Sequence, residues 1–298
     1  MGGMKKSFYI GILLLLQSVV YSQPDSVKVY IDSCLTLLRN NSLYAKKVNW
    51  KQVSKQVHEK ARLAQNKKQT FEALKIVFEA LGDQHAAYYQ YDDQCKLPNL
   101  RLNARYSDSI KAAWKRGNKI NGKMLGTIAY VNVPFLGVNK QADIDSFANW
   151  LYEVVADLSL KKPDGWIIDL RLNGGGNIRP MLGGLAAFFQ DGTIGYYIDQ
   201  NGKATDEASF KNGDFMMDGQ LQASVKSKIP PLVNAKVAVL IGAGTASSGE
   251  GVAAAFQQRS NTRLFGQESA GLANATNGFV FNNKQSYYLI SVAHLADR

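Results

Sequence analysis

The sequence of 298 residues is poor in the residues that mark several common classes of site. Its two cysteines, Cys34 and Cys95, do not have the spacing of a zinc site. There is no Gly-x-x-x-x-Gly-Lys segment, and no Gly-x-Gly-x-x-Gly opens a βαβ unit, which argues against a nucleotide site. We therefore expect neither a metal nor a cofactor. The cysteines leave two alternatives open, a disulfide in an oxidising compartment or a buried free thiol at Cys34.

Dense runs of one charge are also missing. The formal net charge is +11, and it becomes +9 without Lys5 and Lys6, because residues 1–22 contain no acidic residue. The remaining lysines are spread thinly along the chain, which is typical of a solvated basic surface rather than a nucleic-acid site. We therefore expect no nucleic-acid partner.

The only long apolar run lies near the N-terminus. Lys5 and Lys6 precede the apolar run Phe8 to Tyr21, and Val20-Tyr21-Ser22 offers a small-residue cleavage site. The run is shorter than the ~20 residues that a membrane helix needs. We predict that residues 1–22 are a signal peptide and that the mature protein reaches the bacterial periplasm or is secreted. No stable membrane insertion is expected after cleavage.

The rest of the chain predicts a helical unit followed by an α/β core. Apolar residues at helical spacing predict three helices within residues 24–82, and strands alternate with helices after residue 126. An Asn201-Gly202 turn predicts a hairpin, a second hairpin pairs 278–281 with 287–292, and residues 203–235 look irregular. We assign residues 23–91 to an N-terminal helical domain, 92–125 to a connector and 126–298 to the core.

Two predicted strands end in glycine-rich turns. Val237 to Ile241 leads into Thr245 to Glu250, where Ser247 would lie exposed at the start of a helix, a suitable place for a nucleophile. Ser247-x-x-Glu250 is equally a capping box, so a structural role stays open. The strand before Asp169 ends in the loop Gly174 to Gly176, whose N–H groups could serve a phosphate or an oxyanion.

One of the three histidines stands out by its position. His58 lies within a polar stretch of helix, and His294 is close to the end of the chain. His85 follows a helix stop at Gly82 and enters a tyrosine-rich strand, where a side chain can be held firmly. The residues alone leave open a general base or a structural histidine bonded to a backbone carbonyl.

Three segments together resemble the S41 peptidase family, that of the C-terminal processing (tail-specific) proteases and the tricorn core protease. They are Leu-Gly-Asp-Gln-His ending at His85, Asp-Leu-Arg-x-Asn-x-Gly-Gly ending at Gly176, and Thr-Ala-Ser-Ser-Gly-Glu ending at Glu250. They keep the family's order, and the resemblance covers roughly residues 45–298. It implies an α/β core of the ClpP/crotonase kind and a serine peptidase acting on peptides or unfolded proteins.

The resemblance also implies roles for single residues. Ser247 would be the nucleophile, and the oxyanion hole would use the N–H of Ser248 with that of Gly175, or of Gly174 or Gly176. Processing proteases use a downstream lysine in a Phe-Gly-Lys-Gly context, but this chain reads Gly-Gln-Glu from Gly266. Lys284 is the only lysine after the serine, and it lies in a hairpin turn. This favours a Ser/His arrangement like that of the tricorn branch, with His85 as general base.

The sequence also departs from the family. Gln84 stands where the tricorn-like relay has a serine, and the chain stops at Arg298 before a glutamate that relatives carry, so a truncated core stays open. Glu250 and Glu268 are the candidate supporting carboxylates. Residues 92–125 are too few for a PDZ domain. A non-catalytic peptide- or ligand-binding protein on the same fold is the alternative, and a hydrolase of other esters or amides is another.

Overall fold

The structure is a computed structural model that describes residues 22–297. The predicted signal peptide therefore falls almost entirely outside the described residues. Within residues 22–297, no helix is both long and apolar enough to cross a lipid bilayer.

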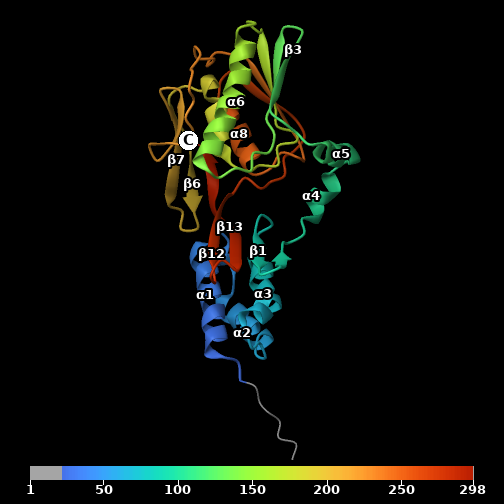
Figure 1. Ribbon diagram of the computed structural model, residues 1–298, viewed down its shortest axis with the longest axis vertical. Helices are drawn as coiled ribbons and strands as arrows, with labels where there is room; N and C mark the ends of the chain where they lie inside the picture. The colour runs from blue at the N-terminus through green and yellow to red at the C-terminus, as the bar shows by residue number, and fades with distance from the viewer. Residues whose placement is uncertain (1–21, 298) are drawn as a thin grey trace, which may run out of the picture.

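The lower lobe in Figure 1 combines the N-terminal helices with the end of the chain. The predicted amphipathic helices are confirmed, because apolar residues on one face of each, such as Ile31, Val57 and Val77, are fully buried. These residues share a core with Tyr88 and Tyr288, so segments far apart in the sequence stabilise one lobe. The lobe contains α1 (Asp25–Asn41), α2 (Trp50–Lys60), α3 (Phe71–Leu81), β1 (Ala87–Gln90), β2 (Asp93–Cys95), β12 (Ala275–Phe281) and β13 (Ser286–Asp297).

The upper lobe is built on a five-stranded sheet in the order β11-β10-β5-β4-β3. The first four strands are parallel, and β3 is antiparallel at one edge. Because β5 and β10 are parallel neighbours, the turns that follow them lie side by side at the carboxyl ends of the strands. The elements are β3 (Asn121–Leu125), β4 (Ile128–Asn132), α6 (Gln141–Ser159), β5 (Gly165–Asp169), α7 (Ile178–Gly184), β10 (Val237–Ile241), α8 (Ser248–Gln257) and β11 (Thr262–Gly266).

Two segments hold more regular structure than the sequence predicted. The expectation of an irregular stretch at residues 203–235 is wrong for residues 204–221, where three strands extend a second sheet in the order β2-β1-β13-β6-β7-β8-β9. These strands are partly exposed and therefore rich in polar residues, so they lack the apolar pattern by which a strand is predicted. Residues 222–235 contain no helix or strand, as expected. The connector 92–125 forms short elements and no PDZ domain. The elements are β6 (Gly192–Asp199), β7 (Ala204–Lys211), β8 (Asp214–Met217), β9 (Gln220–Leu221), α4 (Leu100–Arg105) and α5 (Asp108–Arg116).

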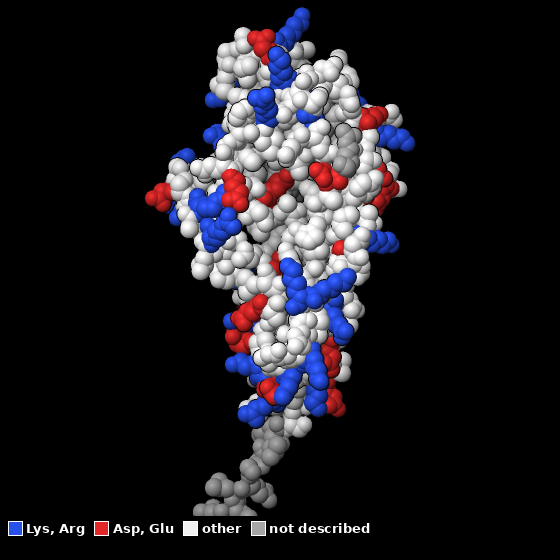
Figure 2. Space-filling view, turned by 180° about the vertical axis from the view of Figure 1, so that it is seen from behind, with Lys and Arg blue, Asp and Glu red and all other residues white. Residues whose placement is uncertain are grey.

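Cys34 and Cys95 are both free thiols. Burial raises the pKa of the Cys34 thiol to about 12, so this thiol stays protonated at neutral pH. The structure therefore favours the buried thiol over the disulfide. On the face drawn in Figure 2, acidic side chains are interspersed among the basic ones, which agrees with a solvated surface.

Candidate active site

Ser247 occupies the turn between β10 and α8 in a strained backbone conformation. Its φ of 53° and ψ of −120° are rare for a residue with a side chain. Such a conformation costs about 1–3 kcal/mol and persists only where the surroundings fix it. The backbone N–H of Ser247 donates to the Glu250 carboxylate at 2.8 Å, which confirms the predicted capping interaction. The helix cap is thus compatible with a half-buried serine that lines a cleft.

The loop from Gly174 to Gly176 lies directly against Ser247. A Cβ atom added to Gly175 would come within 2.7 Å of the Ser247 Cβ, so only glycine permits this approach. Beside it, the Ser248 hydroxyl donates to the Gly176 carbonyl at 2.8 Å. The structure therefore brings together the two glycine-rich strand ends that the sequence singled out separately.

Some backbone N–H groups around this turn already donate a hydrogen bond within the protein, and others do not. The sequence analysis favoured the N–H of Gly175 for the oxyanion hole, but it donates to the Asn173 side-chain oxygen at 2.9 Å. The N–H groups of Gly174, Gly176 and Ser248 have no acceptor among residues 22–297. The glycine loop can therefore offer an unpaired N–H group to an oxyanion, but this group belongs to Gly174 or Gly176 and not to Gly175.

Asn173 is a site residue to which the sequence analysis gave no role. It is fully buried, and its backbone carbonyl accepts the N–H of Ala246 at 2.9 Å. The same carbonyl lies so close to Gly249 that a Cβ there would approach it to 2.6 Å. Asn173 thus joins the glycine loop to the serine turn. Its place within Asp-Leu-Arg-x-Asn was the signal that could have revealed it.

His85 reaches the site from the lower lobe. Helix α3 ends at Gly82, whose φ of 64° turns the chain away from the helix. The buried Asp83 then accepts the His85 N–H at 3.0 Å, and it also accepts the N–H and hydroxyl of Ser291 at 2.8 and 3.0 Å. Asp83 therefore fixes the His85 segment to β13, a role that the sequence analysis did not assign.

The imidazole of His85 is largely shielded from water. Burial lowers its pKa below the ordinary value, while the negative charges of Asp83 and Glu250 act in the opposite direction. Its Nδ1 atom is buried and has no hydrogen-bond partner in the described part of the chain. A lowered pKa keeps the ring neutral near pH 7, the form that can accept a proton.

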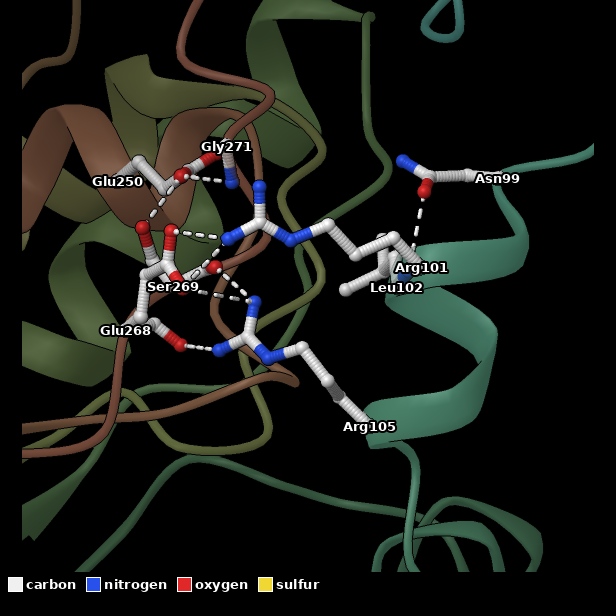
Figure 3. A network of polar contacts seen from close by, with 8 residues as sticks. All are labelled: Asn99, Arg101, Leu102, Arg105, Glu250, Glu268, Ser269 and Gly271. Carbon is white, nitrogen blue, oxygen red and sulfur yellow. Dashed lines mark hydrogen bonds and ion pairs between the residues drawn. The ribbon is translucent and has the colours of Figure 1, made fainter.

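Glu250 binds the segment that follows β11 as well as the serine turn. The residue is only 7% exposed, and its carboxylate accepts the Ser269 hydroxyl at 2.6 Å. It also accepts the N–H groups of Gly271 and Leu272, each at 2.8 Å. Figure 3 shows the bonds to Ser269 and Gly271. With the bond from Ser247, each carboxylate oxygen accepts two hydrogen bonds, so Glu250 acts on His85 by its charge.

Glu268, the other candidate carboxylate, lies on the far side of this network. Its carboxylate forms ion pairs with Arg101 at 3.4 Å and Arg105 at 3.9 Å, and its side chain is 68% exposed (Figure 3). It therefore binds helix α4 rather than supporting the histidine.

The serine turn, the glycine loop and His85 line one cleft of about 750 Å³. It is lined by Ser247, Ser248 and the glycine loop from the upper lobe, and by His85 and Tyr287 from the lower lobe. Among residues 22–297, no cluster of His, Cys, Asp or Glu could hold a metal ion. A hydroxyl, a neutral imidazole and unpaired N–H groups are the components that acyl transfer requires.

Comparison with known proteins identifies the family. The profile of peptidase family S41 matches residues 127–296, more than half of the chain. The chain is 26% identical over 295 residues to the nisin-resistance protein of Lactococcus lactis subsp. lactis, covering 98% of this chain and 85% of that protein.

Solved structures confirm the predicted fold class. A lipoprotein from Streptococcus agalactiae is similar with a TM-score of 0.67 at 18% identity, over 94% of this chain and 89% of that one. The photosystem II D1 C-terminal processing protease is similar with a TM-score of 0.61 at 12% identity, over 91% and 89%. The α/β core with its N-terminal helical region is therefore that of S41 peptidases, and the chain belongs to peptidase family S41.

Proposed function

We propose that this family member is an exported serine peptidase with Ser247 as nucleophile and His85 as general base. The observation that carries the proposal is the cleft, which Ser247 and His85 line together with a loop that has unpaired N–H groups. The strained conformation of Ser247 supports it too, because such strain concentrates at functional positions.

The reaction would follow the two steps of an acyl-enzyme mechanism. The Ser247 hydroxyl attacks the peptide carbonyl carbon while His85 accepts its proton. The N–H of Ser248 and one from the Gly174–Gly176 loop hold the resulting oxyanion. His85 then protonates the leaving amine, and a water molecule activated by the same imidazole releases the acid and restores Ser247.

The substrates we propose are peptides or unfolded proteins outside the cytoplasm. The family assignment supports the peptide bond as the target, and the predicted signal peptide supports export. The Lactococcus relative is named for nisin resistance, so nisin belongs in the panel of test substrates. Matched ester substrates would show whether the site prefers ester hydrolysis.

One observation favours a second candidate, a non-catalytic peptide-binding protein. The Nδ1 atom of His85 has no carboxylate partner within residues 22–297, and such a partner orients the histidine in a serine triad. In this alternative the cleft holds a peptide without cutting it.

Peptide turnover by the mature protein tests the proposal. We expect hydrolysis of an unfolded protein to fall at least about 1000-fold in Ser247→Ala and in His85→Ala. Ser33→Ala on helix α1 is the control and should retain full activity, because Ser33 is exposed and does not line the cleft. Turnover that persists in Ser247→Ala would reject the nucleophile. Peptide binding without turnover, indifferent to Ser247→Ala, would instead establish the binding protein.

A further inference from the structure

We propose that Arg105 on helix α4 is a positioning residue for Ser247. This inference rests on the proposed function, because it takes Ser247 as the nucleophile. The influence of Arg105 runs through residues 268–272 and the Glu250 carboxylate, the network drawn in Figure 3.

The first link is the bond between Ser247 and Glu250. Ser247 keeps its positive φ only while its surroundings hold the turn, and its N–H is held by the Glu250 carboxylate at 2.8 Å. If that carboxylate turned away, the N–H would lose its acceptor and the turn could relax. The direction of the Glu250 side chain therefore bears on the position of the nucleophile.

The second link is the segment that fixes this carboxylate. Three of its four donors, the Ser269 hydroxyl and the N–H groups of Gly271 and Leu272, belong to one short segment after β11. The same segment meets the serine turn again where the N–H of Ala270 donates to the Thr245 carbonyl at 2.8 Å. Displacement of residues 269–272 would therefore remove most of the bonds that orient Glu250.

The third link is Arg105, which holds this segment from outside. Its guanidinium donates to the backbone carbonyl of Ser269 at 2.7 Å and to that of Glu268. The Arg105 side chain is only 24% exposed, and charged donors make the stronger hydrogen bonds. Its neighbour Arg101 differs, because it reaches only the Glu268 side chain, at 3.4 Å, and is 82% exposed. An exposed pair of this kind contributes little.

The contrast between the two arginines gives a matched experiment on the mature protein. The rate of labelling by a fluorophosphonate should fall about tenfold in Arg105→Ala and change less than twofold in Arg101→Ala. For a peptide substrate, kcat should fall with KM within twofold of the wild type, since Arg105 does not itself line the cleft. Arg105→Lys should give an intermediate rate, because one ammonium group cannot hold both carbonyls as a guanidinium does.

Amide hydrogen exchange tests the same inference without any activity. In Arg105→Ala, the amides of Ser247, Gly271 and Leu272 should exchange about tenfold faster than in the wild type or in Arg101→Ala. Equal exchange in all three proteins, or equal loss of labelling in both variants, would overturn the role of Arg105. Absence of labelling in the wild type would reject the proposed function, and exchange would still decide the positioning role.

Discussion

Asp83 accepts two hydrogen bonds from Ser291, one from its backbone N–H at 2.8 Å and one from its hydroxyl at 3.0 Å. Ser291 lies on β13, a strand that pairs with β1 in the lower lobe and with β6 in the upper one. Asp83 also holds the backbone N–H of His85. One strand that joins both lobes therefore sets where His85 lies, and this bears directly on its distance from Ser247.

Replacing Asp83 should harm both stability and activity. Asp83→Ala leaves the buried N–H and hydroxyl of Ser291 without an acceptor, so the free energy of unfolding should fall by about 2–3 kcal/mol. Denaturant unfolding measures this change, and kcat/KM should drop as well because the His85 segment loosens. Asp92→Ala is the control, since Asp92 is a fully exposed partner of Lys68. Equal stability of the two variants would contradict the account.

The pH dependence of activity should report the burial of His85. Protonated imidazole cannot accept the serine proton, so kcat/KM falls as the pH drops through the pKa of His85. Burial lowers this pKa, so the half-maximal point should lie below the ordinary value of 6.5, with most of the activity retained at pH 7. As the pH falls, His85 is protonated in the unfolded chain at a higher pH than in the folded protein. The free energy of unfolding should therefore also decline as the pH falls below 6.5. A midpoint above 6.5 would show that burial does not govern His85.

Substitution of two adjacent glycines by alanine should change kcat/KM to very different extents. In Gly175→Ala the new Cβ would meet the Ser247 Cβ at 2.7 Å, and the φ of +102° adds strain, so kcat/KM should fall at least about 100-fold. Gly174→Ala meets nothing within 4 Å, has no positive φ and keeps its N–H, so its activity should stay within a few-fold of the wild type. Steady-state kinetics with one peptide compares them. Similar losses in both variants would argue against the close contact.

The parts of the fold that could be predicted have local signatures. The apolar run of β10 followed by glycines marks a buried strand and a turn, and the helical spacing of residues such as Ile31 marks an amphipathic helix. The candidate site shared this advantage, because Ser247, the glycine loop and His85 each follow a clear strand or helix end.

What could not be predicted depends on partners that are distant in the sequence. Nothing in the local pattern of β13 indicates that it pairs with strands of both lobes. Arg105 lies in a polar segment without periodicity, and its importance comes only from the carbonyls that it meets. Likewise, Asn173 occupies the N–H of Gly175 through a side-chain orientation that a sequence does not specify.

The central claim is that Ser247 is the nucleophile activated by His85, and covalent labelling with mass mapping tests it most directly. After fluorophosphonate treatment of the protein, we expect one adduct per chain, located on Ser247. The adduct should be absent in Ser247→Ala and should form at least about 100-fold more slowly in His85→Ala. An adduct on another residue, or labelling that survives Ser247→Ala at the wild-type rate, would contradict it.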